Sequence, residues 1–542
     1  MTSNIVQDAP LQPVKSTFKQ SAIPWEGFGI NIRVDDAATI TNQLQGLNSQ
    51  WTRIYLETDD PGVDGIYFNN ETFDKLWESS ENIQTQITRF AYSTFELMGS
   101  RFIFTARTAP LSWLTTDGTN ELRGDALVAF ARYFVSGLLV HKKFGMPVHW
   151  VEILDEPSTV FGTYINPENY VILVQTFRSI LAQRLTPDPV DIQIMGPGLS
   201  CIVTKFQTVE PYIAAFANSE IITDSGVTIP LLDAWSVHVL ENETDAAFYN
   251  EGTFEARNYV RNQFRQTVLY MNWTIPNIPV YVTKYATNAT QYSQGIDYAS
   301  GAPESVEYAI RLMDNVCGIV SSGSSNALCW FLNYRNDKKA LYRNDGSRRP
   351  QRDAFALLNK ILPTNGNIFV STDKTHGTPL DQTIKTFVAS NNSFGFILSR
   401  AHAADDMKGS LNLQIQNPDW SDDKYRSTIT LYVFPNFMSL GAVKKTITVS
   451  KGIMDIVLTG LPYNCVIYGK GDVYAMPTHL VPVVPKSPMG VPRVYDTTML
   501  SNVKTGDIVF NVKDGTLMIY ANGKWHTCQM YNGVAGTSSD NW

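Results

Sequence analysis

Residues 149–158 have the sequence HWVEILDEPS, and this stretch decides the expected fold. Apolar residues dominate from Trp150 to Leu154 and then give way to two carboxylates and a proline. Pro157 cannot donate to a sheet, and it disfavours helix at the residue before it, so a buried strand must end here. A carboxylate at the carboxyl end of a strand, in a chain that alternates strands with helices, is typical of the working face of a (β/α)8 barrel.

The chain around this stretch alternates between strand and helix patterns. Residues 124–143 carry apolar side chains at three- and four-residue spacing, and helices are also expected at 167–184 and 303–319. Besides 148–154, we expect strands at 28–34, 52–57, 101–107, 191–196, 232–239, 279–284 and 327–332. Eight strands with helices between them predict an α/β fold, a closed (β/α)8 TIM barrel.

The pattern changes after the barrel. Short period-two segments separated by turn residues predict an antiparallel β-sandwich. Crowded prolines then predict an extended linker, and Asp514-Gly515 predicts a hairpin in a small C-terminal β module. The expected domains are an N-terminal arm or lent strand at 1–24, the barrel at 25–362, the sandwich at 363–476, the linker at 477–495 and the module at 496–542.

Composition excludes several classes of function. The net charge of −8 and the lack of a basic run argue against nucleic acid and anionic membranes as partners. No apolar run reaches the roughly 18 residues that span a bilayer, and the N-terminus shows no secretion signal. The five cysteines lack metal-ligand or redox spacing, so we expect neither a metal nor a cofactor.

Paired carboxylates at strand ends indicate glycoside hydrolysis. One protonates the leaving oxygen, and the other attacks the sugar from about 5–5.5 Å or activates water from about 6.5–9.5 Å. Glu156 is the candidate acid. Glu152 shares its side of the strand by alternation but lies deeper, so we expect it to be a core or supporting group.

The order of motifs on successive strands resembles the retaining glycoside hydrolases of clan A, most closely family 30, over residues 25–470. The family has Asn-Glu-Pro at the end of strand four, where this chain has Asp155-Glu156-Pro157, so the resemblance makes Glu156 the acid/base. The other positions that match the family in order are Arg53 on strand two, Trp113 after strand three, His238 on strand six and Trp330 on strand eight. With Asp155 and Tyr285 they are our candidate substrate-binding residues.

Strand seven departs from the family. Lys284 stands where the family has its nucleophilic Glu, and an ammonium cannot form a glycosyl ester. It would instead pair with Glu156 and keep that carboxylate ionised, which is the wrong form for an acid. Asp155 is a second departure, because the family Asn can donate to a sugar hydroxyl and an ionised Asp cannot. We therefore expect the retaining mechanism to be absent.

Other interpretations remain open from the sequence. An inverting enzyme could use Glu57 or Glu241 as its second carboxylate. The charged residues could instead be an internal network without a ligand, since removing one buried partner is costly. Trp113, Tyr285 and Trp330 are candidates for stacking on a sugar, although Trp113 and Trp330 also suit a core.

Residues 505–525 resemble small β modules at the ends of bacteriophage tail and other virion proteins. The resemblance implies a virion protein made in the host cytoplasm. It would bind a host surface glycan, contact other virion proteins through the C-terminal module and the N-terminal arm, and form a homo-oligomer. The leading hypothesis is an inactive glycan-binding or structural component. The alternatives are an active virion depolymerase and a cellular glycoside hydrolase.

Overall fold

The structure is a computed structural model of the 542-residue chain. It describes residues 14–32, 43–44, 46–56, 60–80, 100–159, 162–185, 192–200, 206–217, 219–222, 228–240, 254–286, 306–330, 332, 339–343, 345–362, 364, 366–371, 384–389, 393–399, 409–416, 424–434, 439–450, 453–461, 465–472, 474–475, 493–494, 508–511, 516–521 and 523–528.

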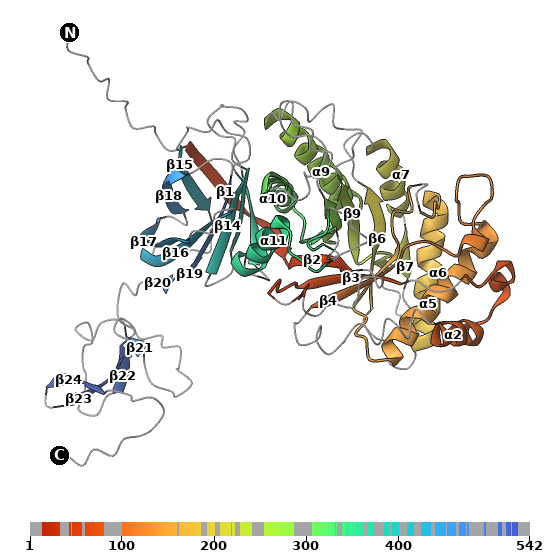
Figure 1. Cartoon of the computed structure of the whole chain (residues 1–542), viewed down its shortest axis with the longest axis horizontal. Coiled ribbons are helices and arrows are strands. Elements are labelled where there is room, and N and C mark those ends of the chain that lie inside the picture. Colours follow the sequence, from red (N-terminus) through yellow and green to blue (C-terminus); the bar gives the residue numbers. More distant parts are fainter. Residues whose placement is uncertain are drawn as a thin grey trace, which may run out of the picture.

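Eight parallel strands close into a barrel, which confirms the predicted fold class (Figure 1). Each lies within a few residues of its predicted position. Around the barrel the strands are β2 (Gly27–Ile32), β3 (Trp51–Leu56), β4 (Arg101–Ala106), β5 (Trp150–Leu154), β6 (Gln193–Ser200), β9 (Ala234–Leu240), β10 (Val280–Ala286) and β11 (Asn326–Cys329).

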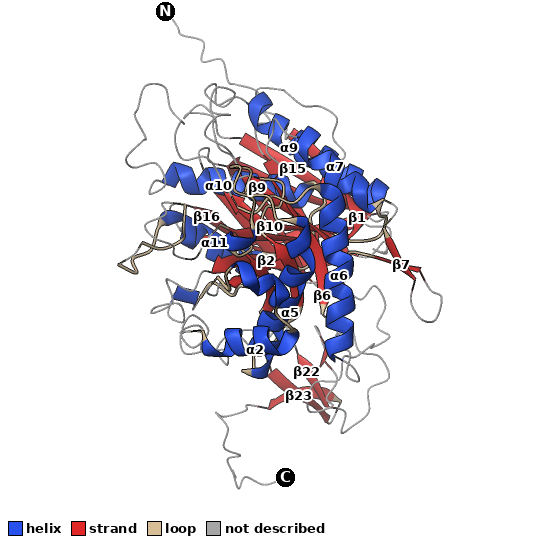
Figure 2. Ribbon diagram, turned by 90° about the vertical axis from the view of Figure 1, so that its right-hand side faces the viewer, coloured by secondary structure: helices blue, strands red, loops and turns tan. Residues whose placement is uncertain are grey.

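Helices surround the barrel strands (Figure 2). The apolar stripe predicted in 124–143 is buried in α5, where Phe130, Phe134 and Leu138 have no exposed surface. The α-helices are α2 (Asn70–Ser79), α5 (Leu127–Lys143), α6 (Pro167–Leu185), α7 (Phe206–Phe216), α9 (Phe254–Thr274), α10 (Val306–Ser321) and α11 (Pro350–Ile361). Short elements are the 3-10 helices η2 (Val63–Tyr67), η3 (Leu111–Trp113) and η4 (Gly124–Ala126), and the strand pair β7 (Glu220–Ile222) and β8 (Thr228–Pro230).

An apolar layer fills the barrel at the amino-terminal ends of its strands. Its aromatic members Trp51, Trp150 and Tyr281 lie with ring centroids 5.1–6.2 Å apart. Ile103, Met195, Ala234 and Leu328 complete this buried cluster. Because strand side chains alternate, the next inward positions of the same strands form a layer above it. That layer is polar.

A second, mainly antiparallel sheet follows the barrel in sequence. It bends back on itself, because β17 pairs with β16 as well as with β18. Its strands are β12 (Gly366–Ser371), β13 (Ile384–Ala389), β14 (Ser393–Ser399), β15 (Gly409–Gln416), β16 (Lys424–Phe434), β17 (Ser439–Ser450), β18 (Ile453–Leu461), β19 (Val466–Asp472) and β20 (Tyr474–Ala475). The N-terminal strand β1 (Val14–Trp25) joins this sheet between β12 and β15, immediately before the chain enters the barrel.

The barrel and the second sheet share one core. Buried side chains of α11, such as Leu358, belong to the same cluster as Ile397 of β14 and Tyr468 of β19. The Tyr468 hydroxyl donates to the backbone oxygen of Ala354, at 3.2 Å. The second sheet therefore packs against α10 and α11 on one side of the barrel.

The C-terminal residues form a four-stranded sheet of β21 (Arg493–Val494), β22 (Ile508–Asn511), β23 (Thr516–Ala521) and β24 (Lys524–Cys528). β22 and β23 are antiparallel, with Asn511 opposite Thr516. The turn at Asp514-Gly515 and most of the predicted linker lie outside the described residues. Among the described helices, none combines the length and apolar character needed to cross a membrane.

Candidate functional site

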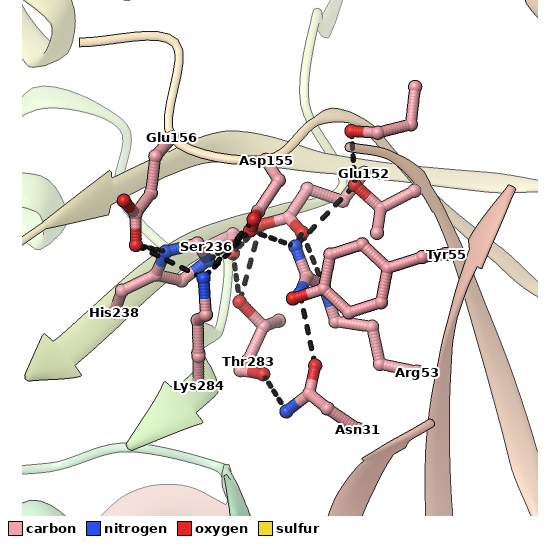
Figure 3. A network of polar contacts seen from close by, with 12 residues as sticks. Asn31, Arg53, Tyr55, Glu152, Asp155, Glu156, Ser236, His238, Thr283 and Lys284 are labelled. Atoms are coloured by element: carbon pink, nitrogen blue, oxygen red, sulfur yellow. Dashed lines mark hydrogen bonds and ion pairs between the residues drawn. The ribbon is translucent and has the colours of Figure 1, made fainter. Parts of the chain in front are cut away.

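Inward-facing polar side chains from several strands meet above the apolar layer (Figure 3). β3 supplies Arg53 and Tyr55, and β5 supplies Glu152. β9 supplies Ser236 and His238. All five are at most 2% exposed. Strand alternation explains why these side chains face inward. Trp51, Trp150 and Ala234 of the apolar layer lie two residues before Arg53, Glu152 and Ser236 on the same strands.

Arg53 is the centre of this layer. Its Nε donates to Glu152 Oε2 at 2.6 Å, and Nη2 donates to Asp155 Oδ1 at 2.7 Å. Nη1 donates to Asn31 Oδ1 at 3.0 Å and also to the Tyr55 hydroxyl. The pKa of Arg53 lies well above its usual value: burial works to lower it, but the charges of Glu152, Tyr55 and Asp155 outweigh burial. The guanidinium therefore fixes the carboxylates of Glu152 and Asp155.

A bulge in β10 brings Lys284 into the barrel. Val282 pairs with Val237 of β9 and Lys284 pairs with His238, so Thr283 is an extra residue in the ladder. Thr283 and Lys284 both reach the network: the Thr283 hydroxyl lies 2.6 Å from that of Ser236, and Lys284 Nζ lies 3.1 Å from Asp155 Oδ2. An unbroken alternation from Thr283 would have turned Lys284 outward and the next residue inward.

Glu156 is held in an unusual backbone conformation. Its φ is +53°, a left-handed value that costs a non-glycine residue about 1–2 kcal/mol. The turn lets the side chain return over the barrel, where Oε1 accepts from His238 Nδ1 at 2.8 Å and from Lys284 Nζ at 3.3 Å. Such strain at a strand end is common at functional sites.

The two departures from family 30 are each other's partners. Lys284 Nζ contacts both oxygens of Asp155, at 3.1 and 3.4 Å, and also contacts Glu156. Neither an Asn at 155 nor a Glu at 284 could form this ion pair. The expected pairing of Lys284 with Glu156 is present, and Asp155 supplies a second carboxylate to the same ammonium.

This pairing keeps the carboxylates ionised. Burial alone would raise the pKa of Glu156, but the Lys284 ammonium and the hydrogen bond from His238 outweigh it, so the pKa lies below its usual value. The pKa of Asp155 is lowered strongly against burial by Lys284 and Arg53. The pKa of Glu152 falls to about 2, because Arg53 and His238 outweigh burial. Glu156 therefore holds no proton at neutral pH that it could give to a leaving group.

His238 completes the balance of charge. Burial lowers the pKa of this imidazole, but hydrogen bonds with Glu152 and Glu156 outweigh burial and leave the pKa raised. The pKa of Lys284 is also raised, because Asp155 and Glu156 outweigh its burial. Three carboxylates thus face Arg53, Lys284 and an imidazole that readily takes a proton. Glu152 is a buried supporting group, in line with its expected depth.

Two of the three proposed stacking residues are not at this site. Trp113 is fully buried: its indole donates to the Gly62 backbone oxygen at 2.9 Å, and its ring packs on Phe73 and Tyr133. Tyr285 is fully buried because the β10 bulge turns it out of the barrel into the surrounding core. A side chain without exposed surface cannot stack on a sugar, so both expectations are wrong.

Trp330 is the aromatic residue that does lie here. It is partly buried, packs near Tyr55, and its ring centroid lies 4.5 Å from Lys284 Nζ. We use "barrel mouth" for the group of Asp155, Glu156, Lys284 and Trp330, which lie at the carboxyl ends of the barrel strands. The structure thus unites most of the predicted site residues. The alternative carboxylates Glu57 and Glu241 lie outside the described residues.

Sequence reasoning missed Asn31, Tyr55, Ser236 and Thr283, which hold the charged groups in place. The Ser236 hydroxyl donates to Glu152, and Asn31 Nδ2 donates to the backbone oxygen of Thr283 at 3.0 Å. A detectable signal existed, because each is a polar residue at an inward position of a mostly apolar strand.

Glu152, Asp155 and His238 also have spacing that could suit a metal ion, with one ligand atom of each within 4.8 Å of the others. Arg53 and Lys284 already contact these carboxylates at 2.6–3.4 Å. A dication bound here would lie beside the positive charges of Arg53 and Lys284, which already pair with these carboxylates, so the arrangement does not favour a metal.

Comparison with known proteins supports the same fold. No protein-family model and no curated protein matches the chain in sequence. Among solved structures, it is similar to a glycoside hydrolase family 30 subfamily 8 xylanase from Clostridium acetobutylicum, with 12% identity, a TM-score of 0.53, and coverage of 84% of this chain and 99% of that one. It is also similar to the catalytic domain of a family 30 xylanase from Talaromyces cellulolyticus, with 12% identity, a TM-score of 0.54, and coverage of 85% and 100%.

A conserved exported protein from Bacteroides fragilis is similar at a TM-score of 0.54 and 10% identity, over 84% of this chain and all of that one. The chain therefore has a glycoside-hydrolase-like fold, a TIM barrel with an accompanying β-sheet domain. At these identities the likeness concerns the fold, and activity must be argued from the barrel mouth.

Proposed function

We propose that the barrel mouth binds a carbohydrate of a host surface and does not cleave it by a retaining mechanism. The observation behind this proposal is the Lys284 ammonium, 3.1 Å from Asp155 and 3.3 Å from Glu156. The retaining reaction needs one carboxylate that attacks and one carboxylic acid that protonates. Here the attacking position holds a cation, and the same cation keeps the acid ionised.

We also propose that the protein is a component of a virion. The C-terminal strands β22 and β23 and the start of β24 belong to the segment that resembles tail-protein modules, and we propose that this module contacts other virion proteins. Residues 1–13 of the N-terminal arm could contribute to such contacts or to a homo-oligomer, whereas residues 14–25 pair within the chain's own sheet. The barrel would then present its mouth to the host glycan.

The test pairs a glycan array with a reducing-end assay on the purified full chain. We expect binding without new reducing ends, and loss of binding in Trp330→Ala. A matched control is Trp273→Ala, since Trp273 is 77% exposed near the end of α9 that leads to the start of β10, at the opposite end of the barrel. Reducing ends that disappear in Glu156→Gln would instead establish an active hydrolase. Absence of any bound glycan would leave only an architectural role.

A further inference from the structure

Arg53 and Lys284, the permanent cations of the network, donate to partners within the described part of the barrel. Arg53 is fully buried, and its three nitrogens donate to Asn31, Tyr55, Glu152 and Asp155. A guanidinium carries five N–H groups, and this set of acceptors occupies its whole fork.

The N–H groups of Lys284 are likewise engaged by neighbouring residues. Its side chain is 6% exposed, and its ammonium contacts Asp155, Glu156 and the face of Trp330. An ammonium has three N–H groups, and these three neighbours match that number. His238 is fully buried; its Nδ1 is engaged by Glu156, and its Nε2 faces Glu152 Oε1 at 3.5 Å.

The carboxylates of Asp155 and Glu156 are more exposed than the cations. The side chains of Asp155 and Glu156 retain 11% and 18% exposure, more than any cation in the network. Glu156 Oε1 receives both His238 and Lys284, whereas Oε2 accepts from no other residue in the part of the chain that the structure describes. The mouth therefore presents a fixed acceptor to an incoming molecule, with the balancing cations beneath it.

We infer that the ligand of the mouth is an uncharged, hydroxyl-rich saccharide that donates a hydroxyl to Glu156 Oε2, and that acidic glycans are excluded. This inference rests on the proposed function and adds the class of ligand. A sugar hydroxyl can donate to an ionised carboxylate in a strong, charge-assisted bond. A uronate or sialate carboxylate has no proton to donate at neutral pH, and it would approach two like charges whose partners are already committed.

Lys339 is a positively charged residue near the mouth that could attract acidic glycans and so oppose the preference for neutral ones. Its ammonium lies 5.8 Å from the Trp330 ring centroid, on the side chain that borders the mouth. An acidic glycan drawn to this part of the surface would depend on Lys339, so Lys339→Ala separates such attraction from recognition by Glu156.

The experiment uses the full chain and an array that carries neutral glycans beside the same glycans with one sialic or glucuronic acid added. Affinities of matched pairs are then measured by calorimetry at low and moderate salt. We expect the neutral member of each pair to bind at least tenfold more tightly, with a gap that narrows as salt screens the repulsion. In Glu156→Gln we expect weaker neutral binding and a smaller gap, and circular dichroism checks that the variant is folded.

Equal or tighter binding of the acidic member, lost in Trp330→Ala or Lys339→Ala, would overturn the inference and leave the proposed glycan-binding function standing. Absence of binding to every glycan would overturn both. The wild-type comparison decides the matter even if Glu156→Gln fails to fold.

Discussion

Replacing Lys284 with methionine removes a buried ammonium and keeps a side chain of similar length. Removing one partner of a buried ion pair costs about 3–5 kcal/mol, because the other charge is left without compensation. Here Asp155 would keep Arg53 at 2.7 Å and Glu156 would keep His238 at 2.8 Å. We therefore expect Lys284→Met to lower the free energy of unfolding by about 3 kcal/mol, the lower end of this range.

The double-mutant cycle with Asp155→Asn isolates the pair. In the double variant both charges are absent. Its loss of unfolding free energy should therefore be smaller than the sum of the losses in the two single variants, with a coupling free energy of about 1–3 kcal/mol. Native-state hydrogen exchange of amides in β5 and β10 is the suitable assay, since it reports the free energy of local opening in a chain of several domains.

The control is Lys75→Met, which breaks the Lys75–Glu71 ion pair on α2, where both side chains are more than 70% exposed. Solvent screens such a pair, so no measurable loss is expected. A coupling free energy of zero between Asp155 and Lys284, or a Lys284→Met effect as small as that of Lys75→Met, would refute the view that this ammonium neutralises the mouth.

Three further outcomes follow from the network and its surroundings. The pKa of Glu152 is lowered to about 2 in the folded chain, so this residue stabilises the fold above its unfolded-state pKa of about 4.3, and the stabilisation is lost as pH falls. The pKa of His238 is raised in the folded chain, so this residue stabilises the fold below its unfolded-state pKa of about 6.5, and the stabilisation is lost as pH rises. The difference in free energy of unfolding between wild type and His238→Gln should therefore be largest below about pH 6.5 and shrink as pH rises; a difference that does not change with pH would contradict this. Gly198→Ala places a Cβ 2.7 Å from Glu152 Oε1 and should lower stability and glycan binding, unlike Gly124→Ala, whose Cβ meets nothing within 4 Å. Trp113→Ala should cost about 3–5 kcal/mol in unfolding free energy and leave glycan affinity unchanged, and lost affinity without lost stability would restore Trp113 as a sugar-stacking residue.

The strand positions could be predicted because they depend on local pattern. Residues 149–158 contain both a strand and its end, since Pro157 stops the ladder whatever surrounds it. The stripe of α5 follows helical spacing for the same reason. Arg53, Asp155 and Glu156 follow from these positions, because the carboxyl ends of parallel strands converge on one face of a barrel.

Lys284 and Tyr285 show where local pattern stops being sufficient. The sequence places both at the end of a strand, and it determines that an ammonium is present there. Only the tertiary structure decides that Lys284 faces inward and Tyr285 outward, because one extra residue in the β10 ladder reverses the alternation of the strand. The partnership of Lys284 with Asp155 is likewise a property of the closed barrel, since these residues lie 129 positions apart in sequence and meet only because their strands belong to one closed barrel.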